Sequence, residues 1–321
     1  MPDLTPEADG FVLHHYAGSP FSQKIRWLMG WHGLHWHSVN VPAIMPKPDV
    51  VALTGGYRKT PFLQRGADIW CDSALMAKVL DAHGRADATL FPAATRGQAE
   101  TLAQWADSSL FWCAIPYAMQ PAGIGALLGN PPPEVLKAFA ADRAAFTPDM
   151  RRPTVADAGA ALRTYLARLE QMLSANPGGF LQGSQPCIAD LSAAQSVWFV
   201  RRAGSPVADV LQPFTLVAAW FDRVAAFGEG QASRLSSADA IAQAHAAAQA
   251  GRHVPVRVAS GQGLEAGAAV QVCATDYGRD VISGELVGLT DDEIVLARED
   301  ERAGRVHVHF PRLGFDVRAA R

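Results

Sequence analysis

The segment from Phe11 to His83 constrains the fold more than any other feature, because its hydrophobic pattern changes in a definite order. Its first residues form a short apolar run that is typical of a buried strand. Ser19 and Pro20 are the residue types favoured at a helix N-cap and at the first helical position. Gly33 is the type that ends a helix. A second strand is expected near residues 36–41, parallel to the first because a helix connects the two.

Two further strands are expected at Pro61–Gln64 and Ile69–Cys71, separated by a turn-forming sequence at residues 65–68. This short turn predicts an antiparallel hairpin. A helix over residues 73–82 would follow it. The sequence therefore predicts a β-α-β unit followed by a β-β-α unit, which together form a first domain over residues 1–84.

After residue 84 the hydrophobic pattern of the chain changes twice, first to a helical period and then to that of short strands. Helical periodicity is clear in residues 98–117, 134–146, 155–173, 188–200, 214–226 and 238–250, with a Gly/Pro-rich break at 121–133. Short strands and turns follow, beginning with Val254–Val258, and they indicate a small β-barrel or β-sandwich. The prediction is an α+β protein with three domains: residues 1–84, an all-helical domain over 94–250, and a small barrel-like β domain over 251–321.

Composition narrows the environment and the partners. The chain has 321 residues, 49% of them hydrophobic, and a formal net charge of −3. Since no cluster of Lys and Arg dominates, neither nucleic acid nor membrane is expected as a partner. The four cysteines are far apart and form no C-x-x-C pair, which favours a reducing compartment. The first residues are acidic and have no apolar run, so no signal peptide is expected and the predicted location is cytoplasmic.

The segment from Ser19 to Arg26 resembles the active-site segment of theta-, zeta- and omega-like glutathione transferases. The resemblance implies that Ser19 stabilises the thiolate of bound glutathione and that Phe21 contributes to the binding site. A helix N-terminus and a hydroxyl donor both favour such an anion. The alternative is that Ser19 is only an N-cap. Because Ser19 stands where the redox-active relatives have Cys, mixed-disulfide chemistry is disfavoured.

Thr60 and Pro61 form the second group, within the sequence Lys-Thr-Pro-Phe-Leu. In the same family a hydrophobic residue precedes a cis-proline at this point, and Thr60 takes that place here. The resemblance implies that Thr60 and Pro61 hold the cysteinyl backbone of glutathione, in the manner of strand addition. The alternative is that Pro61 only starts an edge strand.

Asp72 and Ser73 form the third group, at the start of the helix over residues 73–82. The resemblance implies that Ser73 and the helix N-terminus bind the γ-glutamyl carboxylate, and that Asp72 pairs with the ammonium group. The alternative is that both are ordinary helix-start residues. The helical region adds Cys187 and Asp190, which resemble the family's capping box with Cys187 in place of the usual Ser.

Several residues outside these three groups are further candidates for binding a ligand or a metal. Lys47 is slightly favoured over Lys59 as the partner of the glycyl carboxylate, since a solvated side chain is the default for Lys59. Tyr16 ranks below Ser19, because it is one residue out of phase with the strand-one tyrosine of other transferase classes. The His-x-His pairs at residues 35–37 and 307–309 have no accompanying carboxylate or Cys set, so no metal is expected.

These resemblances imply a glutathione S-transferase-like protein whose residues 1–84 form a thioredoxin-like glutathione-binding domain. They imply that it attacks a small hydrophobic electrophile with glutathione. They also imply a homodimer. Two other functions stay open at this point. The chain can be a glutathione-binding or interaction module without catalysis, or an isomerase or dehalogenase that uses glutathione as its cofactor.

Overall fold

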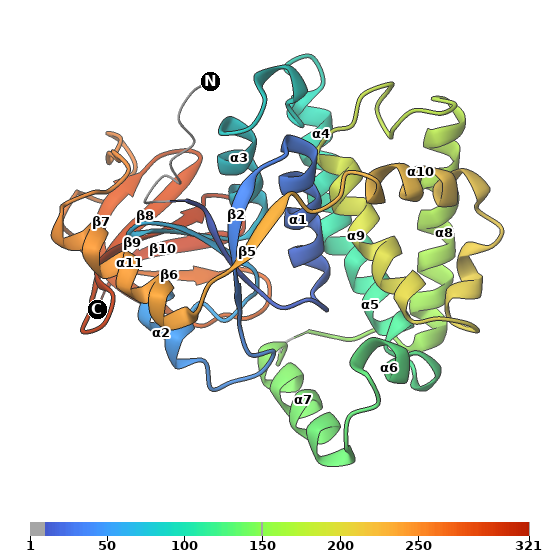
Figure 1. Cartoon of the computed structure of the whole chain (residues 1–321), viewed down its shortest axis with the longest axis horizontal. Coiled ribbons are helices and arrows are strands. Elements are labelled where there is room, and N and C mark those ends of the chain that lie inside the picture. Colours follow the sequence, from blue (N-terminus) through green and yellow to red (C-terminus); the bar gives the residue numbers. More distant parts are fainter. Residues whose placement is uncertain (1–9, 149, 321) are drawn as a thin grey trace.

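The structure, a computed structural model, describes residues 10–148 and 150–320. One ten-stranded sheet runs through it in the order β10-β6-β7-β8-β9-β4-β3-β1-β2-β5. The strands are β1 (Val12–His15), β2 (His35–Asn40), β3 (Phe62–Arg65), β4 (Asp68–Cys71), β5 (Gln231–Arg234), β6 (Ala269–Ala274), β7 (Ile282–Leu289), β8 (Glu293–Asp300), β9 (Gly304–Pro311) and β10 (Phe315–Ala319). Helices cover one part of this sheet and form a separate bundle beside it (Figure 1).

The N-terminal half has the predicted thioredoxin-like arrangement. Strand β1 is parallel to β2 and antiparallel to β3, and β3 is antiparallel to β4. Helix α1 (Pro20–His32) begins at the N-cap Ser19 and ends at Gly33, which has a φ of 66°. Helix α3 (Ser73–Ala82) follows β4 as expected. The parallel and antiparallel pairings predicted from the connections are therefore confirmed.

The C-terminal strands are hydrogen-bonded to the N-terminal sheet. Strand β9 lies parallel to β4, with Asp68 opposite His307 and Trp70 opposite His309. The expected additional β region is thus present, and it extends the thioredoxin-like sheet. The expected strand Val254–Val258 is not formed, and only Val258 makes a bridge, to Leu289. At the opposite edge, the unexpected strand β5 pairs in parallel with β2.

The helices beyond α1 and α3 are α2 (Pro48–Thr54), α4 (Arg96–Trp105), α5 (Phe111–Ala118), α6 (Pro121–Leu128), α7 (Pro133–Phe146), α8 (Val155–Ser174), α9 (Ile188–Arg202), α10 (Thr215–Ala225) and α11 (Ser237–Gln249), with short 3₁₀ segments at Ala86–Ala88 and Ala208–Leu211. The helix expected over residues 98–117 is divided into α4 and α5 by a π-helical segment, Ala106–Leu110. Helices α2 and α6 were not expected. Helix α7 projects below the sheet and the bundle (Figure 1).

Alternation along the N-terminal strands divides the core into two layers. Leu13 and Leu63 face the layer shared with the helical bundle. Their neighbours Val12 and Phe62 face a second layer, which α11 and the C-terminal strands also line. Since successive side chains of a strand point to opposite faces, each short strand contributes to both layers.

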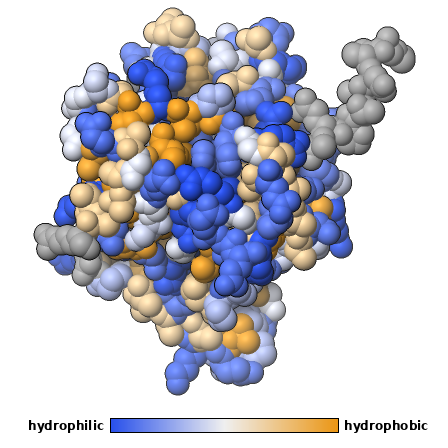
Figure 2. All heavy atoms as spheres, turned by 90° about the vertical axis from the view of Figure 1, so that its left-hand side faces the viewer, coloured by the Kyte–Doolittle hydropathy of each residue, from blue (hydrophilic) through white to orange (hydrophobic). Residues whose placement is uncertain are grey.

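The surface on the side of the C-terminal strands is mostly hydrophilic, with scattered hydrophobic areas (Figure 2). Leu313, between β9 and β10, is 75% exposed and is the most exposed large hydrophobic side chain of the described part of the chain. Among the helices that the structure describes, none combines the length and apolar character needed to cross a bilayer.

Candidate functional site

The first two sequence groups meet where α1 begins. The Ser19 hydroxyl donates to the Thr60 carbonyl at 3.4 Å and accepts from the Ser22 N–H at 3.2 Å. The Thr60–Pro61 peptide bond is cis, as the resemblance implied. Ser19 is only 2% exposed. The structure therefore gives Ser19 the N-cap role and also directs its hydroxyl toward the segment before Pro61.

The third group lies at the start of α3. Asp72 is the N-cap of this helix, and its carboxylate accepts from the Ala74 N–H at 2.8 Å. Its φ is 72°, a conformation that non-glycine residues seldom adopt. The Asp72 N–H donates to the Tyr57 hydroxyl at 3.1 Å. Such unusual backbone geometry is concentrated at ligand-binding positions, which fits the role that the resemblance implied.

Ser73 leads to a residue that the sequence analysis missed. The ammonium group of Lys24, on α1, donates to the Ser73 hydroxyl at 3.3 Å and to the Asp107 carboxylate at 2.6 Å. Lys24 is 1% exposed. The Asp107 carboxylate also accepts from Gln195 at 2.6 Å. Burial raises the pKa of the Asp107 carboxyl, and the nearby Lys24 ammonium opposes that rise. A buried cation therefore stands next to Ser73, where the carboxylate of a ligand is expected.

Lys47 lies next to Thr60. Its ammonium group donates to the Thr60 hydroxyl and to the Arg58 carbonyl, both at 3.4 Å. Lys47 is 4% exposed, and burial, with the positive charge of Arg143 as a further cause, lowers its pKa to about 8. The preference for Lys47 over Lys59 is compatible with this placement, because Lys59 is directed elsewhere.

Tyr16 lies closer to the candidate site than the sequence ranking suggested. Burial raises the pKa of its hydroxyl, and the positive charge of the nearby Arg143 opposes the rise. Arg143 belongs to α7 and donates to the Ala43 carbonyl. Tyr16 therefore lies near Arg143, although its position in β1 is one residue out of phase with the strand-one tyrosine of other transferase classes.

Helix α7 is fixed over this region by its penultimate turn. Asp142 accepts from Arg58 at 2.7 Å and from the Met45 N–H at 3.2 Å. The helix was expected, but its position beside the segment before Pro61 was not. No sequence signal indicates that position, since Asp142 and Arg58 are far apart in the chain.

The loop between β6 and β7 reaches the same region from the C-terminal strands. The ring of Tyr277 meets Trp112 at a centroid distance of 5.0 Å and Phe146 at 5.2 Å, both edge-on. The Lys59 ammonium lies 4.1 Å from the centroid of the Tyr277 ring and 2.6 Å from the Asp276 carboxylate. Lys59 therefore binds this loop, and the expectation of a solvated side chain was wrong.

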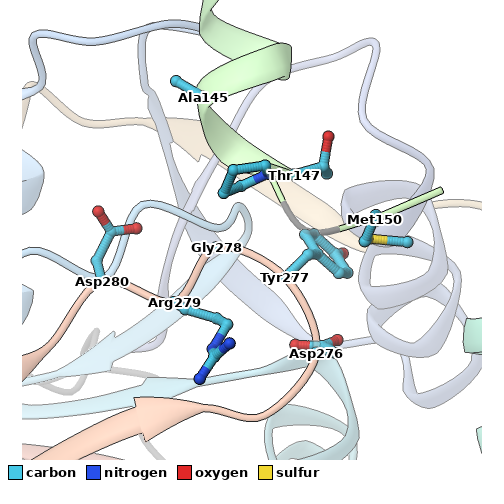
Figure 3. Close-up of a pocket in the computed structure, with 9 residues that line it drawn as sticks. Ala145, Thr147, Met150, Asp276, Tyr277, Gly278, Arg279 and Asp280 are labelled. Carbon is cyan, nitrogen blue, oxygen red and sulfur yellow. The ribbon is translucent and has the colours of Figure 1, made fainter. Parts of the chain in front are cut away.

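Tyr277 is close to the candidate site as well as to the surface. Burial and the negative charges of Asp276, Asp72 and Asp107 hold the pKa of Tyr277 well above its usual value. On its outer side Tyr277 lines a cavity of about 180 Å³ between the end of α7 and the β6–β7 loop (Figure 3). Tyr277 therefore lines this cavity and is near enough to Asp72 and Asp107 for their charges to affect its hydroxyl.

Phe21 faces the helical bundle, with its ring 4.7 Å from that of Phe111 between centroids. The predicted site residues thus occupy one region: Ser19, Phe21, Lys47, Thr60, Pro61, Asp72 and Ser73 lie at the start of α1, the segment before β3 and the start of α3. That region offers the hydroxyls of Ser19, Thr60 and Ser73, together with two buried ammonium groups and the N-termini of α1 and α3. Such a set can hold a ligand with several anionic groups.

One of the missed residues had a usable signal. Lys24 is four residues before the apolar Leu28, so helical spacing places it on the buried face of α1. A buried lysine requires a charged partner, which is a reason to search for one. Tyr277 and Arg143 had no such signal, because only the fold brings them to this region.

Comparisons with known proteins give a consistent result. Residues 13–86 match the family described as "Glutathione S-transferase, N-terminal domain", and residues 152–223 match "Glutathione S-transferase, C-terminal domain". A comparison with curated proteins finds no match. A GST-like protein from Pseudomonas syringae has a similar solved structure, with 38% identity and a TM-score of 0.78 over 97% of this chain and 100% of that one.

More distant structures share only part of the chain. A glutathione S-transferase from Rhodospirillum rubrum F11 is 16% identical, with a TM-score of 0.52 over 67% of this chain and 87% of that one. A beta-etherase from Sphingobium sp. strain SYK-6 is 19% identical, with a TM-score of 0.50 over 68% of this chain and 92% of that one. At these identities the likeness concerns the fold alone.

Proposed function

The chain belongs to the glutathione S-transferase family, and on that premise we propose that it binds glutathione and holds the sulfur as a thiolate for attack on a small hydrophobic electrophile. The observation that carries this proposal is the meeting of Ser19 with the cis Thr60–Pro61 segment, 3.4 Å from hydroxyl to carbonyl. In the bound state the Ser19 hydroxyl would turn from the Thr60 carbonyl and donate to sulfur.

Groups at the start of α1 can supply the free energy that is needed to lower the pKa of the glutathione thiol. A free thiol has a pKa of about 8.5, and lowering it by about two units takes roughly 2.7 kcal/mol. A hydrogen bond to a charged group contributes about 1.5–3 kcal/mol. The N-terminus of a helix adds about 0.3–2 kcal/mol. Ser19 and α1 together are therefore sufficient for a thiolate at neutral pH.

The remaining residues would position glutathione. Thr60 and Pro61 would hold the cysteinyl backbone, and Lys47 would pair with the glycyl carboxylate. Asp72 and Ser73 would bind the γ-glutamyl end, with Lys24 supplying positive charge behind Ser73, 3.3 Å from its hydroxyl. The backbone N–H groups at the start of α3 favour a carboxylate at that place.

The reaction proceeds by nucleophilic attack. The thiol loses its proton to solvent, and the thiolate electron pair forms a bond to carbon of the electrophile. With an aromatic halide, the halide then leaves with the electron pair of the carbon–halogen bond. With an epoxide, the carbon–oxygen bond opens and the alkoxide takes a proton from water. Phe21 and Phe111, packed against each other, would form part of the apolar side of the pocket.

The decisive experiment measures the thiolate absorbance of bound glutathione against pH. The wild-type protein is expected to lower the thiol pKa by about two units, and Ser19→Ala to reverse at least half of that shift. Ser22→Ala is the matched control, since it removes a buried hydroxyl on the same helix that has no hydrogen-bond partner in the described structure. An unshifted pKa in the wild type, or equal values for the wild type and Ser19→Ala, would contradict the mechanism.

Experiments on the same protein can distinguish two other functions from glutathione transfer. A non-catalytic binding module is favoured by the 2% exposure of Ser19. Retention on immobilised glutathione without turnover of any aromatic halide or epoxide would support it. A metabolite screen with glutathione would detect an isomerase or dehalogenase. From the family we also propose a cytoplasmic homodimer, which sedimentation and cell fractionation can test.

A further inference from the structure

A histidine cluster occupies the seam between the N-terminal sheet and the C-terminal strands. Asp68 is on β4 and His307 is opposite it on β9, while His253 belongs to the irregular segment between α11 and β6. One possible ligand atom from each of the three side chains lies within 4.8 Å of those of the other two. Three separate segments of the chain therefore converge on one point.

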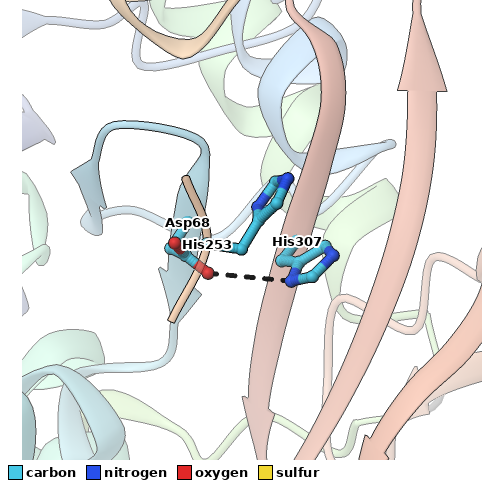
Figure 4. Close-up of side chains that lie close together, drawn as sticks. All are labelled: Asp68, His253 and His307. Atoms are coloured by element: carbon cyan, nitrogen blue, oxygen red, sulfur yellow. Dashed lines mark ion pairs between the residues drawn. The ribbon is translucent and has the colours of Figure 1, made fainter. Parts of the chain in front are cut away.

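Each of the two imidazoles has one buried nitrogen without a hydrogen-bond partner. Their rings are stacked, with centroids 3.8 Å apart and an interplanar angle of 18° (Figure 4). The Nδ1 atoms of His253 and His307 are buried and have no hydrogen-bond partner among the described residues. His307 Nδ1 is 3.9 Å from Asp68 Oδ1, which is too long for a hydrogen bond. Buried polar atoms left unpaired in this way require an explanation.

The Asp68 carboxylate is oriented by its other contacts. It accepts from the Val254 N–H at 2.9 Å through Oδ2 and from His309 Nε2 at 2.9 Å through Oδ1. His309 Nδ1 is 2.8 Å from Glu293. Carboxylate ligands of metal ions are commonly fixed by hydrogen bonds of this kind.

The Asp68 carboxylate is the anionic member of this group, and a cation placed between it and the two imidazoles would meet one oxygen donor and two nitrogen donors.

We propose that Asp68, His253 and His307 bind a zinc ion that joins the C-terminal strands to the N-terminal sheet. Two imidazole nitrogens and one carboxylate form a donor set that suits zinc, whereas magnesium and calcium prefer oxygen ligands alone. Zinc bonds of about 2 Å require the donors to approach one another by roughly 1 Å, and the His253 ring must turn out of its stack on His307 so that both nitrogens point at the ion. His253 can supply this movement, because it is half-buried and lies outside any helix or strand. Water would complete the coordination.

The test is a zinc titration of the full-length chain without an affinity tag, after treatment with a chelator. The protein is expected to bind one zinc ion per chain, and added zinc is expected to raise Tm. His253→Ala should weaken zinc binding by at least about tenfold and abolish the rise in Tm. His35→Ala is the matched control, since His35 is exposed on β2, and it should bind zinc as the wild type does.

Two further measurements keep the test decisive. If His307→Ala fails to fold, His253→Ala still carries the comparison, because His253 lies in an irregular segment. Cobalt added in place of zinc should give the visible bands of a low-symmetry site in the wild type and lose them in His253→Ala. Magnesium should have no effect on Tm. The proposal is overturned by the absence of stoichiometric zinc binding, or by equal zinc affinity in His253→Ala and His35→Ala.

Discussion

The ring of Tyr277 meets the ring of Trp112 edge-on, with 5.0 Å between their centroids. Tyr277 belongs to the loop between β6 and β7, and Trp112 belongs to α5 of the helical bundle. Edge-to-face pairs of this kind contribute about 0.5–1.5 kcal/mol beyond burial of their surface. The contact joins the C-terminal strands to the bundle, and we expect it to limit access to the candidate site.

Replacing Tyr277 by Ala is expected to open that access. The association rate of glutathione should rise several-fold, because the loop no longer closes over the start of α3. The variant should also lose about 2–3 kcal/mol of unfolding free energy with its aromatic contacts. Stopped-flow tryptophan fluorescence measures the rate. Tyr277→Phe is the control, because it keeps the ring and should keep the wild-type rate. A rate that is unchanged in Tyr277→Ala would argue against a closing role.

Lys24→Met is expected to destabilise the protein strongly. It removes the ammonium group 2.6 Å from Asp107 and leaves a largely buried carboxylate without its counter-ion. Removal of one partner from a buried pair costs about 3–5 kcal/mol. The double variant Lys24→Met, Asp107→Leu should recover most of this loss, because neither charge then remains. Urea unfolding of both variants checks the prediction, which is wrong if the double variant is no more stable than the single one.

Burial of the Lys47 ammonium group is expected to lower the free energy of unfolding, although the same group contributes to glutathione binding. Its pKa is about 8 in the folded chain against an ordinary value of 10.5. Below pH 8 the Lys47 amine is protonated in both the folded and the unfolded chain, so the folded chain bears the full cost of burying the ammonium group. Between pH 8 and 10.5 the unfolded chain binds the extra proton, so stability should rise with pH in that window.

Lys47→Met should therefore be more stable than the wild type at pH 7, by up to roughly 3 kcal/mol. It should lose the rise in stability above pH 8 and bind glutathione about tenfold more weakly. Lys137→Met, at an exposed position of α7, is the control and should change neither quantity. Urea unfolding at several pH values and glutathione titration give both results. A variant less stable than the wild type at pH 7 would disprove the desolvation argument.

Asp190 should act in folding alone. Its carboxylate accepts from the Leu181 N–H at 2.9 Å, the Cys187 N–H at 2.9 Å and Trp220 Nε1 at 2.8 Å. Asp190→Ala leaves these three buried N–H donors and the Cys187 thiol without their acceptor, at a cost of about 4 kcal/mol or more. Chemical denaturation measures it.

Asp222→Ala is the comparison for that variant, because Asp222 forms an exposed ion pair with Arg201. Exposed pairs contribute about 1 kcal/mol or less, so Asp222→Ala should be close to the wild type. The thiol pKa of bound glutathione should be the same in the folded fraction of both variants. A changed pKa in Asp190→Ala would contradict a purely structural role.

Local pattern predicted most of the N-terminal domain. The N-cap at Ser19, the end of α1 at Gly33 and the order of strands and helices all follow from residue type and hydrophobic period. The same patterns missed α2 and β5 and predicted a strand at Val254–Val258 that is absent from the structure. Short elements depend on their neighbours for hydrogen bonds, and no local period records which neighbour is present.

The candidate site was predicted only in part, because local pattern identifies single motifs but not the distant residues that pack beside them. Ser19, Thr60 and Ser73 were identified from short motifs at helix and strand starts, and the structure brings them to one region. Their roles toward glutathione stay predictions. Lys24 was missed although its helical position could have indicated burial. Tyr277 was out of reach, because a loop far along the chain enters the site only through the β6–β7 connection.

The sequence by itself determined that a thioredoxin-like unit has Ser19 and not Cys at the head of α1, which favours thiolate stabilisation over disulfide exchange. Only the tertiary structure decided what surrounds it. The parallel pairing of β4 with β9 places His307 beside Asp68 and extends one sheet from end to end. Such contacts join residues that are far apart in the chain. The free energy of burying them depends on the whole assembly, so no local sequence pattern specifies them.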